Sequence, residues 1–92
     1  MTTIAGKTIL LTGASRGIGA FIARTLAKEQ ATIIGVSRSK EGLDQIGVEV
    51  QKLGGEWIAI PFDLSQVENL PNLLEQINQR VGTIDILINN AG

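Results

Sequence analysis

Thr12–Gly19, with the sequence TGASRGIG, separates a short apolar run from a longer segment with helical periodicity. The run before it, Thr8–Leu11, is expected to form a strand that is buried on both faces. The segment after it, Gly17–Glu29, is expected to form a helix. Glycines in such a turn allow a tight exit from the strand, close approach of the backbone to a pyrophosphate, and close packing of helix on sheet. The stretch therefore predicts a nucleotide-binding turn.

The spacing of Gly13, Gly17 and Gly19 is G-x-x-x-G-x-G, a variant of the general dinucleotide fingerprint. Backbone N–H groups at the start of the following helix, together with the helix dipole, would attract phosphate groups. The alternative is that these glycines only turn the chain from strand to helix. Their place inside a strand–helix–strand unit favours the nucleotide site.

The rest of the chain continues the alternation of strands and helices. The expected strands are Ala31–Val36, Trp57–Phe62 and Ile84–Ile88, and the expected helices are Lys40–Leu53 and Pro71–Arg80. Ser65–Glu68 is expected to form a single turn, because Pro71 would break a helix that began at Ser65. Strands separated by helices predict an α/β fold of order βαβαβαβ, with a parallel sheet and right-handed crossovers.

Apolar residues at helical spacing predict which face of each helix is buried. They are Ile18, Phe21, Ile22, Thr25 and Leu26 in the first helix, Leu43, Ile46, Val50 and Leu53 in the second, and Leu73, Leu74 and Ile77 in the third. Gly42 and Gly47 are expected to weaken the second helix by roughly 1 kcal/mol each relative to alanine.

Composition excludes several classes of function. The 92 residues contain no Cys and no His, so we expect no disulfide, no thiolate metal site and no histidine base. The net charge of −1 gives no indication of electrostatic binding to nucleic acid or to an anionic membrane. The sequence shows no signal peptide and no apolar run near the ~20 residues of a membrane helix, so a cytoplasmic location is the default expectation.

The end of the second strand, Val36–Ser39, bears on the choice of dinucleotide. Rossmann-type sites that prefer NAD usually carry an acid here, whereas an Arg accommodates the 2′-phosphate of NADP. Position 37 is Ser, and Arg38 follows it. With Arg16 from the glycine-rich turn, Arg38 could clamp a phosphate by charge-assisted hydrogen bonds, so NADP is expected. The alternative is that both are ordinary solvated arginines.

Three motifs together resemble those of the short-chain dehydrogenases/reductases. They are Thr12–Gly19, the pair Asp63-Leu64 after the third strand, and Asn89–Gly92 (NNAG) after the fourth. The resemblance covers essentially the whole chain. It implies a Rossmann-type, partial doubly wound parallel sheet in the strand order 3-2-1-4, with the first two helices on one face and the third on the other.

The resemblance also implies roles for individual residues. Those expected around the adenosine phosphates and ribose are Gly13, Ser15, Arg16, Gly17, Ile18 and Gly19, joined by Ser37 and Arg38. Asp63 would accept a hydrogen bond from the adenine amino group, with Leu64 beside the ring. Asn89, Ala91 and Gly92 would line the adenosine-ribose side, and Asn90 would tie the sheet together. Asp63 could instead cap the turn before Ser65, and the double Asn could be simple turn chemistry.

The activity implied is that of an NADP(H)-dependent oxidoreductase, which transfers hydride between nicotinamide and a small carbonyl or alcohol substrate. Proton transfer in the resembled family uses a Tyr with a Lys four residues later, and this sequence has no Tyr. We therefore assign no catalytic residue. Residues 1–92 are expected to be the N-terminal part of a single NAD(P)-binding domain in a longer protein, itself a homo-oligomer like most family members.

Other interpretations remain open. A non-catalytic nucleotide-binding module or degenerate family member would also lack the Tyr. An S-adenosylmethionine-type enzyme is disfavoured because no acidic residue closes the second strand. The implied topology would leave much of one sheet face and the edge of the fourth strand open, so we expect the isolated chain to be unstable or to associate.

Overall fold

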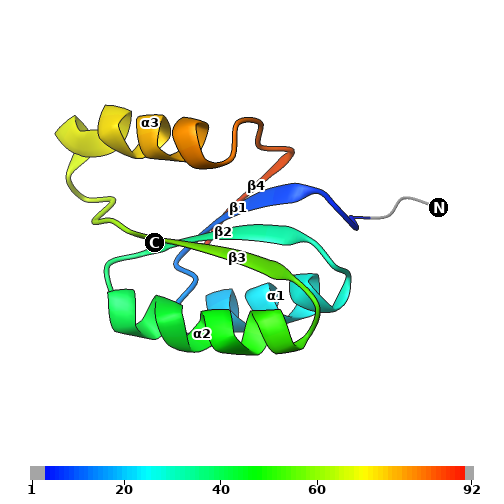
Figure 1. Ribbon diagram of the computed structural model, residues 1–92. Coiled ribbons are helices and arrows are strands. Elements are labelled where there is room, and N and C mark those ends of the chain that lie inside the picture. Colours follow the sequence, from blue (N-terminus) through cyan, green and yellow to red (C-terminus); the bar gives the residue numbers. More distant parts are fainter. Residues whose placement is uncertain (1–3, 91–92) are drawn as a thin grey trace.

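Strands and helices alternate along the chain, as the sequence predicted. The computed structural model describes residues 4–90. Its strands are β1 (Thr8–Thr12), β2 (Thr32–Ser37), β3 (Glu56–Pro61) and β4 (Ile86–Asn89). Its helices are α1 (Gly17–Lys28), α2 (Lys40–Lys52) and α3 (Leu70–Arg80), with the short 3₁₀ helix η1 (Val67–Asn69) before α3. Figure 1 shows this order from the blue N-terminal strand to the red β4.

The four strands form one parallel sheet in the order β3-β2-β1-β4. Leu10 of β1 lies opposite Ile34 of β2 and Leu87 of β4, and Ile34 lies opposite Ile58 of β3. This confirms the Rossmann-type topology. The carboxyl ends of all four strands consequently lie at the same edge of the sheet.

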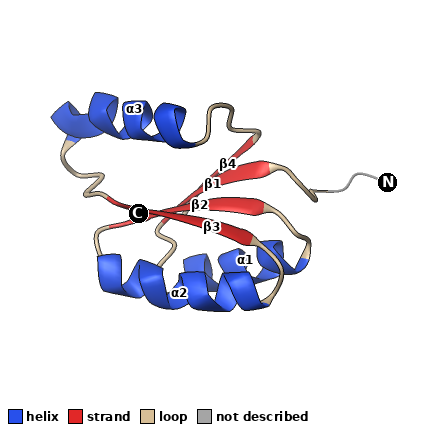
Figure 2. Ribbon diagram, viewed as in Figure 1, coloured by secondary structure: helices blue, strands red, loops and turns tan. Residues whose placement is uncertain are grey.

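Helices cover both faces of the sheet, with α1 and α2 on one face and α3 on the other (Figures 1 and 2). The core under α1 and α2 contains Ile9 and Leu11, whereas Leu10, between them, belongs to the core under α3. Successive residues of a strand point to opposite faces. A strand buried on both faces therefore reads as a continuous apolar run, which explains why β1 could be located from the sequence.

The predicted buried face of α1 was wrong in part. The buried residues of α1 are Gly19, Ala20, Ala23 and Ala27. Ile18 and Phe21 are 71% and 67% exposed, and Thr25 is also exposed. Ile22 and Leu26 are partly buried against the core, as expected. Small side chains let the helix axis approach the sheet closely, and this close packing turns the larger side chains to its flank and outer face.

Two further expectations about buried helix faces needed smaller corrections. Leu43, Ile46 and Val50 are buried as predicted, whereas Leu53 at the C-cap of α2 is 36% exposed. In α3, Leu74 is 61% exposed. It follows Leu73, which takes the inward position, and the next residue of an α-helix points roughly 100° further round the helix axis.

The fourth strand begins at Ile86 rather than at the predicted Ile84. Asp85 pairs with β1 through Thr8, whose backbone N–H donates to Asp85 Oδ2 at 2.9 Å, while the Asp85 N–H donates to the Thr8 carbonyl at 2.9 Å. The side chain thus replaces a backbone carbonyl acceptor, and the regular ladder starts one residue later.

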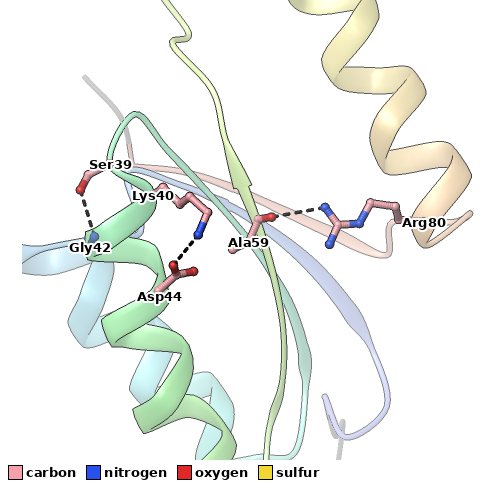
Figure 3. A network of polar contacts seen from close by, with 6 residues as sticks. All are labelled: Ser39, Lys40, Gly42, Asp44, Ala59 and Arg80. Atoms are coloured by element: carbon pink, nitrogen blue, oxygen red, sulfur yellow. Dashed lines mark hydrogen bonds and ion pairs between the residues drawn. The ribbon is translucent and has the colours of Figure 1, made fainter.

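Buried apolar side chains and a side-chain hydrogen bond hold α3 on the sheet. Leu73 and Ile77 are 4% and 2% exposed and pack on the β1–β3 surface. Each such burial contributes roughly 1.5–3 kcal/mol. At the last turn, Arg80 Nη1 donates to the Ala59 carbonyl oxygen of β3 at 3.3 Å (Figure 3). Pro71 lies in the first turn, where a missing N–H costs little.

The sheet face that carries α3 is incompletely covered over β4. Leu87 is 63% exposed, although its neighbour Leu10 in β1 is 9% exposed. This matches the open surface expected from the topology; whether the chain associates through it stays a prediction. Within residues 4–90, none of the helices is long and apolar enough to cross a membrane.

Candidate functional site

A pocket of about 750 Å³ lies where the loops after the strands converge. Its lining residues are Gly13, Ser15, Arg16, Ser37, Arg38, Asp63, Leu64, Ser65 and Asn90. The volume falls within the roughly 300–1,000 Å³ usual for small-molecule sites. In open parallel sheets, ligands bind outside the carboxyl ends of the strands, at the point where the strand order reverses. Here that point is between β1 and β4, because the chain moves outward from β1 to β3 and then returns to β4.

The glycine-rich turn that follows β1 has a backbone conformation that requires its glycines. Gly13 and Gly17 have φ values of +65° and +60°, a region that costs other residues roughly 1–2 kcal/mol. The N–H of Gly13 donates to the Val36 carbonyl oxygen at 2.9 Å, so the turn is held against the end of β2. The chain then enters α1 with its first turn at the pocket rim.

Gly19 allows the start of α1 to lie directly against this turn. A Cβ at position 19 would overlap the Gly13 carbonyl oxygen and would lie 2.8 Å from Asn90 Nδ2. The Asn90 amide itself donates to the Gly13 carbonyl at 3.3 Å. Only glycine therefore fits between the turn and the loop after β4.

The N-terminus of α1 presents positive charge to the pocket. Arg16 is the N-cap residue, in an extended conformation, and its side chain is exposed. The first turn of α1 contains no acidic residue that would neutralise the positive end of the helix dipole. Such an end favours anions, above all phosphate groups.

The end of β2 adds a second cation and two hydroxyl groups. The hydroxyls of Ser15 and Ser37 lie 2.7 Å apart and share a hydrogen bond. Arg38 is exposed on the pocket wall. Lys40, whose role the sequence left open, pairs with Asp44 at 2.8 Å on the surface of α2, and this hydrogen bond raises the pKa of the lysine (Figure 3).

Asp63, at the end of β3, forms a turn with Ser65. Its Oδ1 accepts hydrogen bonds from the Ser65 backbone N–H at 2.9 Å and the Ser65 hydroxyl at 2.7 Å. These bonds, with a smaller contribution from the charge of Arg38, hold the pKa of the Asp63 carboxyl below its ordinary value of 3.8. The turn-forming alternative considered for Asp63 is thus present. Both of these hydrogen bonds use Oδ1 of the carboxylate.

The structure brings most of the predicted site residues to this one pocket. Those on its wall are Gly13, Ser15, Arg16, Ser37, Arg38, Asp63 and Leu64. Gly17, Ile18 and Gly19 lie in the first turn of α1, and Asn89 ends β4 beside Thr12; these four residues do not line the pocket. Ala91 and Gly92 lie outside the described residues.

Two lining residues were not among the predicted ligand contacts. Asn90 was expected only to tie the sheet together, and it does so by its bond to Gly13, but it also lines the pocket. Ser65 had been considered only as a turn residue. The spacing Asp63-x-Ser65 is the signal that could have placed it, because an Asp side chain commonly bonds the backbone two residues on.

The residues on the wall suit an anionic, hydrogen-bonding ligand. Two arginines, Arg16 and Arg38, line the pocket together with one acidic residue, Asp63. The serine hydroxyls and the Asn90 amide add hydrogen-bonding groups. Within residues 4–90 there is no cluster of three or more side chains able to hold a metal ion.

A parallel sheet in the order 3-2-1-4 with a glycine-rich turn at its centre defines the chain as part of a Rossmann-type domain. Residues 7–92 match the short chain dehydrogenase family. The chain therefore belongs to the short-chain dehydrogenase/reductase family.

Individual relatives agree with this assignment. The chain is 59% identical over 92 residues to the ketoacyl reductase HetN of Nostoc sp. strain PCC 7120, covering 100% of this chain and 32% of the relative. L-sorbose reductase of Gluconobacter frateurii, solved with NADPH and L-sorbose, superposes with a TM-score of 0.90 at 35% identity, covering 98% of this chain and 35% of the reductase. Xylitol dehydrogenase bound to NAD⁺ superposes equally well, with a TM-score of 0.90 at 31% identity, covering 99% and 35% of the two chains. This chain thus spans about a third of the length of the proteins it matches.

Proposed function

We propose that this chain holds the adenine half of NADP(H) in an oxidoreductase that reduces a carbonyl group or oxidises an alcohol. The observation that carries the proposal is the convergence of the glycine-rich turn, Arg38, Asp63 and Asn90 on one pocket. The pyrophosphate would lie against the first turn of α1, and the adenine near Asp63 and Leu64. The remaining predicted contacts, Gly17, Ile18, Gly19, Asn89, Ala91 and Gly92, would complete the rim.

Charge at the pocket supports NADP over NAD. Arg16 and Arg38 both line it, and position 37, where an acid would favour the ribose hydroxyl of NAD, is Ser. Fork-like guanidinium groups suit a phosphate because they donate parallel, charge-assisted hydrogen bonds. The similar structures include one solved with NADPH and another solved with NAD⁺. The preference for NADP is therefore inferred from Arg16, Ser37 and Arg38 of this chain.

The dinucleotide would supply hydride to a carbonyl carbon, or accept it from an alcohol. The residues of this chain would bind and orient it. The proton that accompanies the hydride has no assigned donor here, because the 92 residues include neither Tyr nor His. We propose that residues of a longer protein supply it, and that the substrate resembles the ketoacyl compounds after which the Nostoc relative is named.

Calorimetric titration of the purified protein with NADPH and with NADH tests the cofactor assignment. We expect NADPH to bind at least roughly tenfold more tightly, because a phosphate held by charged groups is worth about 1.5–3 kcal/mol. Equal affinities would remove the NADP assignment, and binding of neither would remove the nucleotide site. In the longer protein that would supply the proton donor, oxidation of NADPH on addition of a ketoacyl thioester then separates an oxidoreductase from a non-catalytic nucleotide-binding module.

A further inference from the structure

Gly42, in the first turn of α2, lies against the glycine-rich turn. A Cβ at position 42 would be 2.9 Å from Ser15 Cβ and 3.1 Å from Ser39 Oγ, closer than side-chain carbons normally approach. The Gly42 N–H also donates to Ser39 Oγ at 2.9 Å, which caps the helix (Figure 3). Gly42 was expected only to weaken α2. Its place in the structure instead allows the start of α2 to lie against Ser15, which lines the pocket.

Three serines connect this helix start to the glycine-rich turn. The Ser15 hydroxyl bonds the Ser37 hydroxyl at 2.7 Å. The backbone N–H of Ser39 donates to Ser37 Oγ at 3.3 Å, and Ser39 Oγ accepts from Gly42. This serine chain, Ser15–Ser37–Ser39, therefore holds the residues on both sides of Arg38.

The side chain of Arg38 itself is exposed, with the freedom of a long solvated side chain. Ordering such a side chain on a ligand costs about 0.5–1.5 kcal/mol. A backbone held on both sides limits where the guanidinium can reach, so less freedom remains to be lost when a phosphate binds. If the start of α2 moved away from Ser15, Arg38 would move with it.

We infer that Gly42 is a positioning residue for cofactor selectivity: by seating the first turn of α2 on Ser15, it holds Arg38 where it recognises the 2′-phosphate. The inference rests on the proposed function, because it assumes that Arg38 faces that phosphate. It assigns selectivity to a residue that lies outside the pocket wall and carries no side chain.

The test is Gly42→Ala, with Gln45→Ala as the matched control on the exposed surface of the same helix. The added methyl group would lie 2.9 Å from Ser15 Cβ, so either the start of α2 or the turn at Ser15 must shift. We expect the Kd for NADPH to rise roughly tenfold and that for NADH to change less than about twofold, since only NADPH carries the phosphate. Gln45→Ala should change neither Kd. Calorimetry gives both constants, and circular dichroism confirms that each variant is folded.

A second variant decides the matter if Gly42→Ala does not fold. Ser39→Ala removes the capping acceptor but adds no overlap, and it should reduce the NADPH preference in the same direction by a smaller factor. Equal weakening of NADPH and NADH by either variant would show a general structural role and overturn the inference.

Arg38→Ala distinguishes failure of this inference from failure of the proposed function. If Arg38→Ala removes the NADPH preference while Gly42→Ala and Ser39→Ala retain it, only the positioning role is overturned. If Arg38→Ala leaves the preference unchanged, or if the protein binds neither dinucleotide, the proposed function fails and this inference fails with it.

Discussion

Asn90 joins the loop after β4 to the glycine-rich turn, because its side-chain amide donates to the Gly13 carbonyl oxygen at 3.3 Å. Its backbone N–H donates to Thr12 Oγ1 at 2.9 Å, and the Thr12 hydroxyl donates to Asn89 Oδ1 at 2.9 Å. Two motifs that are 77 residues apart in sequence thus meet at the carboxyl ends of β1 and β4. The position of the glycine-rich turn depends on this junction.

Thr12→Val should weaken that junction without changing its shape. Thr12 is 7% exposed, and its hydroxyl serves both asparagines. Valine is nearly isosteric but leaves the Asn90 N–H without that acceptor, so we expect a loss of about 1–3 kcal/mol of stability. Thr25→Val is the control, because Thr25 is exposed and its hydroxyl donates to the Phe21 carbonyl within α1. Its free energy of unfolding should stay within about 0.5 kcal/mol of the wild-type value. Urea unfolding measures both, and equal effects would refute the proposed role of the Thr12 hydroxyl.

Arg38→Asp should invert the cofactor preference. The change removes a cation from the pocket wall and places a carboxylate near the end of β2, where an acid favours the ribose hydroxyl of NAD. Loss of a charged hydrogen bond costs about 1.5–3 kcal/mol, which is roughly a tenfold to 100-fold rise in the NADPH Kd. The NADH Kd should stay the same or fall. Lys52→Asp, at the far end of α2, carries the same change in charge and should leave the ratio of the two constants unaltered.

The sequence was sufficient for the order of elements and for most of the pocket wall. Strands buried on both faces and glycine-bounded helices are local patterns, and parallel strands bring their carboxyl ends to one edge whatever the details. The buried face of α1 was harder to predict from the sequence. Hydrophobic periodicity is dominated by large apolar residues, whereas this helix packs through Gly19 and three alanines. What favours small residues there is the distance between helix and sheet, which no local pattern contains.

The glycines of α2 could not be interpreted from the sequence for the same reason. From the sequence, Gly42 and Gly47 were expected only to lower the stability of the helix. In the structure, each lies against a residue that is distant in sequence. Gly42 faces Ser15, and Gly47 faces Trp57, whose indole also lies over Gly35. Similarly, the hydrogen bond between the hydroxyls of Ser15 and Ser37 joins two residues that are 22 positions apart in sequence.

Asp63 should titrate at a lower pH than an ordinary aspartate. Ser65 stabilises the charged form through its hydroxyl and its backbone N–H, and the pKa therefore lies below 3.8. Because the folded-state pKa is the lower one, the stabilisation is fully present above pH 3.8 and is lost as the pH falls through the folded-state pKa. Carboxyl NMR shifts would follow this titration. Ser65→Ala should raise the midpoint toward 3.8, and should do so more than Arg38→Ala, since the hydroxyl is the largest cause. A wild-type midpoint at or above 3.8 would contradict the assignment.

Gly47→Ala should destabilise the protein even though alanine is the better helix former. Alanine gains about 1 kcal/mol over glycine in a helix interior. Here, however, its Cβ would lie 2.5 Å from Trp57 Cδ1 and 2.8 Å from Nε1, and overpacking of this kind costs about 1–3 kcal/mol.

A double-mutant cycle with Trp57→Leu separates these two effects on Gly47→Ala. In the Trp57→Leu background the overlap is gone, and Gly47→Ala should stabilise the helix by up to about 1 kcal/mol. Trp57 Nε1 is buried without a hydrogen-bond partner, so its removal leaves no other polar atom unpaired. The change of sign between the two backgrounds, measured by urea unfolding, is the diagnostic result. If Gly47→Ala had the same effect in both, the indole would not be the reason that α2 keeps a glycine at its centre.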